Sequence, residues 1–101
     1  MSYPFYDGQI KCPDMSAEYR PIDQITPYAN NPRKHPQSQI NKLKASLLHR
    51  GWSHALLVDD KGNLICGHGR LVAAEQLGAT HVPVRNIGST SEAERIAMII
   101  A

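Results

Sequence analysis

The sequence predicts a small α+β domain, of mixed α/β type, in which a short mixed sheet is covered by about three helices. Short apolar runs bounded by glycine or proline alternate with longer segments whose apolar residues recur at helical spacing. The chain of 101 residues is long enough for one core without disulfides or a metal. The hydrophobic fraction of 42% and the charged fraction of 20% are those of an ordinary globular domain.

Residues 1–17 are predicted to be an N-terminal extension, and residues 18–101 to form the domain. Breakers at Pro4, Gly8 and Pro13 interrupt the first segment, whose apolar residues follow no period. The N-terminus does not have the basic and apolar regions of a signal peptide, and no apolar stretch reaches the length of a membrane span. We therefore expect a cytoplasmic protein without a membrane partner.

The first strand of the domain is predicted from Tyr19 to Ile25, and a proline-rich loop follows it. A helix is expected to begin at Pro36, since the N–H that proline lacks would be unpaired at the first helical position. It is expected to end at Gly51, which suits the left-handed position after a helix. Its predicted apolar stripe consists of Ile40, Leu43, Leu47 and Leu48.

The second half predicts a hairpin of strands 55–58 and 64–66, with Gly62 supplying a positive φ in the turn. A second helix is expected to open at Gly69 or Arg70 and to stop at Gly78.

A short strand over residues 82–84 is expected at an edge or a strand start, because Pro83 cannot donate a backbone hydrogen bond. Ser91 and Glu94 form a capping box for a last helix. That helix has no C-cap before Ala101, so we expect a domain truncated within it.

The strongest functional signal is the run Cys-Gly-His-Gly-Arg at residues 66–70, set between a strand and a helix. Backbone N–H groups at Gly67, His68 and Gly69, together with the positive end of the helix dipole, are suited to phosphate. Arg70 adds a fork of donors for phosphate oxygens. In the alternative interpretation, the glycines only permit a tight turn and Arg70 is solvated or pairs with an acid such as Glu75 or Asp59.

His68 could donate to a phosphate oxygen or act as a general acid or base, or it could be an exposed turn residue. Cys12 and Cys66 match neither a zinc nor a redox spacing, and Cys66 is interpreted as a small buried hydrophobe. The other four histidines do not fall at metal spacing, so no protein metal site is predicted. Trp52 is expected to pack in the core.

Three blocks of the sequence resemble the ParB/sulfiredoxin superfamily, and specifically its ParB-like nuclease domain. They are residues 25–35, with the run Asn-Pro-Arg-Lys-His; residues 47–58, with Arg-Gly-Trp; and residues 62–84, with the glycine-rich box. The resemblance implies that Asn31, Arg33 and His35 face the box and take part in nucleotide binding.

The Gly-His-Gly-Arg form of the box resembles a branch found in phage and mobile elements beside DNA methyltransferases. Partitioning ParB proteins bind CTP with a Glu-Arg-Arg box, whereas this chain has His68 and Gly69 at the first two of these positions. Sulfiredoxins have a catalytic cysteine where His68 stands. The resemblance therefore does not imply CTP-gated clamping or sulfinic acid reduction for this chain.

Together these observations predict a nucleotide- or phosphate-binding domain that acts in DNA metabolism, with DNA as a partner. The expected cofactor is a nucleoside triphosphate, CTP or ATP, with Mg²⁺. Whether it is an enzyme is left open; an NTP hydrolase or phosphodiesterase would use His68 as its catalytic residue. The alternatives are a non-catalytic DNA- or protein-interaction module that recruits a methyltransferase, and an ATP-dependent kinase-like activity. The oligomeric state, including a homodimer, is also left open.

Overall fold

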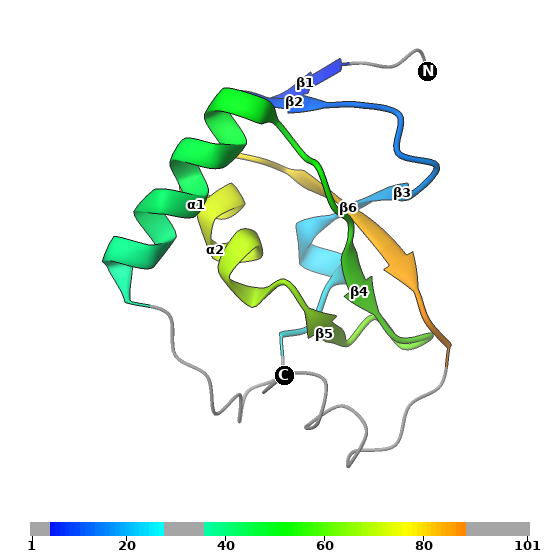
Figure 1. Ribbon diagram of the computed structural model, residues 1–101. Coiled ribbons are helices and arrows are strands. Elements are labelled where there is room, and N and C mark those ends of the chain that lie inside the picture. The colour runs from blue at the N-terminus through cyan, green and yellow to red at the C-terminus, as the bar shows by residue number, and fades with distance from the viewer. Residues whose placement is uncertain (1–4, 28–35, 89–101) are drawn as a thin grey trace.

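The computed structural model of the protein describes residues 5–27 and 36–88, and it shows a mixed sheet beside two helices (Figure 1). The elements in chain order are β1 (Phe5–Asp7), β2 (Ile10–Cys12), β3 (Glu18–Pro21), the 3-10 helix η1 (Ile22–Gln24), α1 (Gln37–Arg50), β4 (Leu56–Val58), β5 (Leu64–Cys66), α2 (His68–Gln76) and β6 (His81–Asn86). This arrangement confirms the predicted α+β class. The predicted third helix and its capping box lie outside the described residues.

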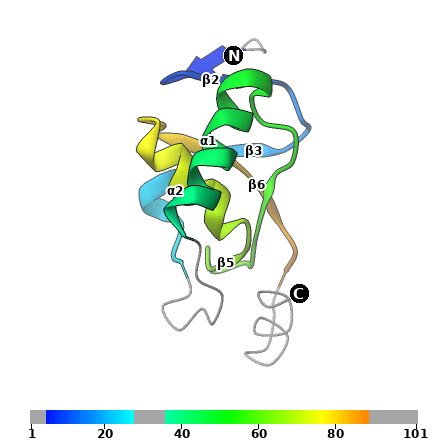
Figure 2. The same cartoon turned by 60° about the vertical axis from the view of Figure 1, so that its left-hand side comes forward.

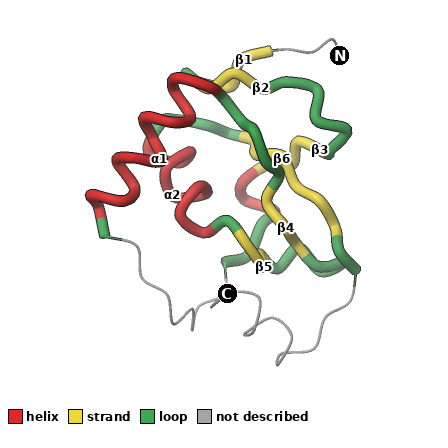
Figure 3. The backbone as a smooth tube through the Cα atoms, in the orientation of Figure 1, coloured by secondary structure: helices red, strands yellow, loops and turns green. Residues whose placement is uncertain are grey.

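The main sheet has the strand order β3-β6-β4-β5 (Figure 3). Strand β6 pairs antiparallel with β3 and parallel with β4, and β4 pairs antiparallel with β5 as the hairpin prediction required. Strand β6 is therefore interior rather than at an edge. The Ile22 N–H donates to the Thr80 carbonyl, so by strand alternation residue 83 faces away from β3, towards the side of β4. Pairing with β4 begins only at Val84, so no ladder hydrogen bond is lost where Pro83 lacks its N–H.

The first seventeen residues contain a β-hairpin, which the sequence did not predict. Strands β1 and β2 pair antiparallel, and the side chains of Ile10 and Cys12 are 0% exposed. The Asp7 carboxylate accepts hydrogen bonds from the Thr80 backbone N–H at 2.8 Å, the Thr80 hydroxyl at 2.9 Å and the His81 N–H at 2.7 Å. The hairpin is thus joined to the turn between α2 and β6; the domain boundary at residue 18 stays a prediction.

Helix α1 follows the prediction closely at both ends. Pro36 directly precedes it, and Gly51 ends it with φ 73°. A Cβ at Gly51 would lie 2.5 Å from the carbonyl oxygen of Lys11, so the close approach of β2 also requires glycine there. One member of the predicted apolar stripe is wrong: Leu48 is 47% exposed, while Leu47 is buried.

Several predicted element bounds also change: β4 begins at Leu56 rather than at residue 55, and β6 spans His81–Asn86 rather than 82–84. The predicted strand over 19–25 ends at Pro21, and the 3-10 helix η1 continues the chain to Ile25, whose side chain is buried. Helix α2 begins at His68, one residue earlier than the earliest predicted start, and Gly78 has the expected positive φ of 82°.

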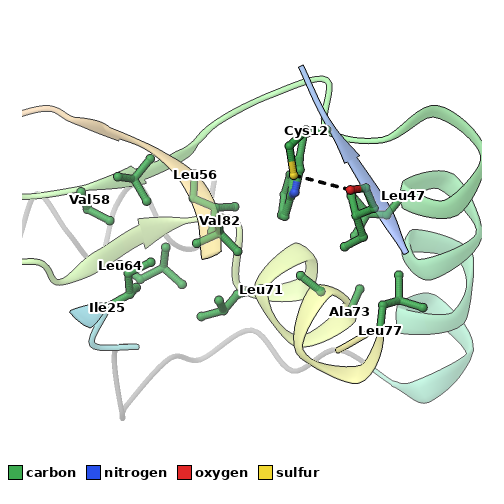
Figure 4. Close-up of a cluster of buried hydrophobic side chains, with 14 of the residues drawn as sticks. Cys12, Ile25, Leu47, Leu56, Val58, Leu64, Leu71, Ala73, Leu77 and Val82 are labelled. Atoms are coloured by element: carbon green, nitrogen blue, oxygen red, sulfur yellow. Dashed lines mark hydrogen bonds between the residues drawn. The ribbon is translucent and has the colours of Figure 1, made fainter. Parts of the chain in front are cut away.

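Helices α1 and α2 pack against each other beside the sheet (Figure 2). Neither has the length and apolar character needed to span a bilayer. One hydrophobic cluster joins the hairpin, both helices and the sheet (Figure 4). Its buried members include Cys12, Leu47, Leu56, Leu71 and Val82, and the dashed line in the figure marks the Cys12 Sγ–H donating to the Ile10 carbonyl at 3.5 Å.

Candidate functional site

The glycine-rich box forms the predicted strand–turn–helix unit. Strand β5 ends at Cys66, Gly67 adopts a left-handed conformation with φ 103°, and α2 begins at His68. A Cβ at Gly67 would lie 2.3 Å from Leu56 Cδ2, so both the conformation and the packing require glycine. No side chain caps α2 at Gly67. The start of this helix therefore lacks the side-chain acceptor that Ser, Thr, Asp or Asn would supply.

Arg70, in the first turn of α2, lines an open cavity of about 680 Å³. Other walls come from the β-strands and from the segments that precede β3 and β4. The described residues that line the cavity are Pro13, Met15, Trp52, Ser53, His54, Ala55, Leu57, Cys66, Arg70 and Arg85. Two guanidinium groups line the cavity and no carboxylate does among these residues, so its charge favours an anion.

Of the predicted box residues, Arg70 belongs to the lining just given, whereas Gly67, His68 and Gly69 do not. Gly69 is buried within α2, and His68 and Arg70 are half-buried. The loop residues Asn31, Arg33 and His35 lie outside the described residues.

The sequence did not identify Arg85, Ser53 or His54 as cavity residues. In the sheet, Arg85 of β6 pairs in register with Leu57 of β4, and Leu57 pairs with Cys66 of β5. Residues paired across neighbouring strands have their side chains on the same face of a sheet. Arg85, Leu57 and Cys66 therefore lie on one face. Arg85 lies outside the strand predicted over 82–84, and the pairing of β6 with β4 is not visible in the sequence.

Trp52 is packed in the core as expected, yet it also lines the cavity. Its side chain is only 2% exposed, and its indole Nε1–H is buried without an acceptor among the described residues. Buried N–H groups are nearly always hydrogen-bonded, because a lost partner costs about 1–3 kcal/mol. The cavity wall thus includes a side chain with an unpaired, enclosed donor.

The salt bridge weighed for Arg70 is not present in the described part of the chain, where the observed ion pair joins Arg20 and Glu18 at 2.8 Å. Asp59 instead holds the β4–β5 turn: its carboxylate accepts from the N–H groups of Lys61 and Asn63, both at 2.9 Å. Glu75 lines a different cavity of about 710 Å³ together with Asp23 and His81. The two cavities thus differ in charge, and the Arg70 cavity is the cationic one.

The two cysteines lie in contrasting environments, and neither forms a disulfide. Burial raises the pKa of the Cys12 thiol to about 11, and the negative charge of Asp7 adds to the rise. Cys66 is half-buried and lines the Arg70 cavity, so it is not the fully buried residue that the sequence suggested. Within residues 5–27 and 36–88, no three His, Cys, Asp or Glu side chains are grouped closely enough to hold a metal ion.

Comparison with known proteins gives a family match over most of the chain. The model of the ParB N-terminal domain family matches residues 13–101. The ParB-like nuclease domain-containing protein YnaK of Escherichia coli is 46% identical over 66 residues, which are 65% of this chain and 76% of that protein. A probable chromosome-partitioning protein ParB of Rickettsia bellii is 32% identical over 81 residues, 77% of this chain and 28% of that protein.

Two solved structures share the fold. ParB from Caulobacter crescentus, complexed with CTP-γ-S, has a TM-score of 0.72 at 20% identity, over 83% of this chain and 50% of that one. Sulfiredoxin from Arabidopsis thaliana has a TM-score of 0.65 at 18% identity, over 83% of this chain and 96% of that one. The chain therefore spans half of the Caulobacter structure and about a quarter of the Rickettsia protein.

Proposed function

Because the chain belongs to the ParB N-terminal domain family, we propose that it binds a nucleoside triphosphate in the Arg70 cavity and acts in DNA metabolism. The superfamily inferred from the sequence motifs is confirmed by this match and by the two folds that resemble it. The observation that carries the proposal is the cavity itself, which two arginines line and whose described lining includes no acidic residue. Its volume lies within the usual range for small-molecule sites.

Arg70 and the start of α2 are proposed to hold the phosphates. A cation in the first turn opposes the helix dipole at a cost of about 0.3–1 kcal/mol, and a bound phosphate would offset that cost. The backbone N–H groups of Gly67, His68 and Gly69 are proposed as further donors. Asn31, Arg33 and His35 remain proposed contacts from the preceding loop.

The rest of the cavity offers donors of a different kind. The Trp52 indole N–H, the Ser53 hydroxyl and the His54 ring suit the uncharged oxygens and nitrogens of a base or sugar. The described lining supplies no carboxylate for Mg²⁺, so the ion would be carried on the phosphates themselves. The CTP analogue bound by the Caulobacter relative makes CTP the first nucleotide to test, with ATP as the alternative.

The test is the thermal stability of the protein against the four ribonucleoside triphosphates, with and without Mg²⁺. A ligand at a hundred times its Kd stabilises the fold by about 2.7 kcal/mol, which raises Tm by roughly 10 °C or more in a domain of this size. Arg70→Ala should abolish the rise. Arg50→Ala is the matched control, because Arg50 is exposed at the end of α1 and does not line the cavity. If no nucleotide raises Tm, the interaction-module alternative is favoured.

Catalysis is tested on the same samples by measuring phosphate release and phosphate transfer to an added hydroxyl compound. His68 is proposed as the acid or base, so His68→Ala should keep the nucleotide-dependent rise in Tm while losing turnover. A protein that binds nucleotide without turnover would be a non-catalytic module. A second structure of ParB from Caulobacter crescentus, complexed to the centromeric parS site, has a TM-score of 0.67 at 20% identity and suggests DNA as the partner. This partner is tested by titrating duplex DNA with and without the bound nucleotide.

A further inference from the structure

We infer that Cys66 is a modification site, at which its thiol exchanges with anionic low-molecular-weight disulfides of the glutathione class and the attached group fills the Arg70 cavity. The exchange reaction at Cys66 is inferred from the cavity alone. That the attached group then excludes nucleotide rests on the proposed function.

The sheet register places Cys66 close to positive charge. Cys66 pairs with Leu57, which in turn pairs with Arg85, so the cysteine and this arginine are separated by two strand spacings on one face. That is roughly 10 Å between backbones. Arg70 lies in the first turn of α2, shortly after Cys66 in the sequence, and it lines the same cavity. A disulfide reagent that carries carboxylates would be concentrated there by both guanidinium groups.

A second observation at the same cavity points to a ligand with acceptor atoms. The Trp52 indole N–H, on a side chain that lines the cavity wall, is buried and has no acceptor among the described residues. The carboxylate and amide oxygens of a peptide-like disulfide are acceptors for an N–H donor of this kind. Cationic charge and an unpaired donor thus favour the same class of reagent.

Cys12 provides a contrast within the same chain. It is fully buried, its pKa is raised to about 11, and the nearby carboxylate of Asp7 would repel an anionic reagent. Only the thiolate attacks a disulfide, so Cys12 should be inert while the protein is folded. Selective reaction at Cys66 would therefore come from the folded structure and not from the sequence around either cysteine.

The reaction is a thiol–disulfide exchange. The Cys66 thiolate attacks one sulfur of the small disulfide, that disulfide's S–S bond breaks, and a new S–S bond joins Cys66 to half of the reagent. The other half leaves as a thiolate and takes up the proton that Cys66 lost. The Cys66 sulfur is oxidised from thiol to disulfide, and the sulfur of the departing half is reduced from disulfide to thiol. A thiol reductant reverses the step.

The test measures the rate of modification of each cysteine by peptide mass spectrometry, with no nucleotide present. Dithiodipropionate and cystamine are used as reagents because they have arms of similar length and opposite charge. For each cysteine, the rate of modification by dithiodipropionate is divided by the rate with cystamine. This ratio is then divided by the same ratio in the urea-unfolded protein, which corrects for the different intrinsic reactivities of the two reagents. We expect Cys66 to prefer the anion by roughly tenfold or more and Cys12 to stay unmodified.

Arg85→Gln should reduce the preference to roughly twofold or less, while Arg50→Gln, which removes the same charge from α1, should leave it intact. The inference is overturned if folded Cys66 shows no preference for the anion, or if Arg50→Gln reduces the preference as much as Arg85→Gln. It is also overturned if Cys12 reacts as fast as Cys66 in the folded protein.

The regulatory consequence is tested separately, by adding nucleotide to protein carrying a glutathionyl group on Cys66 and to the Cys66→Ser variant. Modified protein should lose the rise in Tm and regain it after reduction. In Cys66→Ser the rise, whatever its size, should be the same before and after treatment with oxidant. If nucleotide does not raise the Tm of the unmodified protein, the proposed function is wrong. The modification site is then judged only by the measured rates of reaction of Cys66 and Cys12. If modified protein still binds nucleotide, the blocking role is wrong.

Discussion

At the scale of single residues, glycines and cysteines show how strongly position governs chemistry. Gly67 and Gly78 flank α2 and both have positive φ, yet only Gly67 has a neighbouring side chain where a Cβ would lie. Cys12 and Cys66 differ likewise, one being enclosed by the core and the other lining a cationic cavity. The same residue type therefore has different roles because its surroundings differ.

Gly67→Ala is expected to destabilise the protein by about 2–4 kcal/mol, since the new methyl group would collide with Leu56 and the backbone is left-handed. Gly78→Ala is the matched control: it has a similar φ but open space around it, and it should cost only about 1 kcal/mol. Urea unfolding of the two variants measures the difference. Equal losses would show that contact with Leu56 does not restrict position 67.

The raised pKa of Cys12 predicts a loss of stability in alkali. The thiol has an ordinary pKa of 9.0 and one of about 11 in the folded protein, so the unfolded state releases its proton first. This contribution to the free energy of unfolding is complete below pH 9 and is lost as the pH rises from about 9 to about 11. The free energy of unfolding of Cys12→Ala, measured by urea unfolding, should decline less steeply over that pH window than that of the unsubstituted protein. If the two plots of free energy against pH run parallel, the assignment to Cys12 is wrong.

At the scale of the elements, the β1–β2 hairpin depends on contacts far away in the sequence. Its strands are three residues each, too short for an isolated hairpin to be stable in water. Asp7 joins it to Thr80 and His81, and Ile10 joins it to the core. The hairpin was therefore invisible to periodicity, because packing and one carboxylate stabilise it and local propensity does not.

Asp7→Ala is expected to lower the free energy of unfolding by about 1–3 kcal/mol, because the Thr80 and His81 N–H groups would lose their acceptor. Hydrogen exchange should then show faster exchange of the β1–β2 amides. Asp14→Ala serves as the control, since Asp14 accepts a hydrogen bond from Ser16 within its own loop. If the two variants exchange alike, Asp7 does not hold the hairpin in place.

At the scale of the whole molecule, one hydrophobic cluster includes side chains from the hairpin, both helices and the four-stranded sheet. The cationic cavity is built on the same scaffold, with walls from α2, three strands of the sheet and the segment after α1. Because those walls come from distant parts of the chain, the cavity exists only when the whole domain is folded.

Ile10→Ala should cost about 2–5 kcal/mol, as truncations of fully buried aliphatic side chains do. Leu48→Ala is the comparison, because Leu48 is largely exposed and its loss should change stability by roughly 0.5 kcal/mol or less. The pair, measured by urea unfolding, tests whether the hairpin belongs to the cooperative core. A small effect at Ile10 would mean that the hairpin unfolds separately.

The sequence by itself determined the features that depend on neighbours in the chain. These are the α+β class, the glycines that end α1 and α2, the β4–β5 hairpin, and the turn that sets Arg70 at the start of α2. Each follows from local backbone preference and periodicity, which are legible within a few residues. The family resemblance could be recognised for the same reason, since its motifs are short.

Only the tertiary structure decided which distant residues share a surface. It brought Arg85 and Trp52 to the cavity of Arg70, turned Leu48 to solvent, and placed Ile10 in the core. The interior place of β6 likewise follows from pairing with two strands far away in the chain. Strand order and helix packing depend on the burial of side chains across the whole molecule, which no local pattern of the sequence encodes.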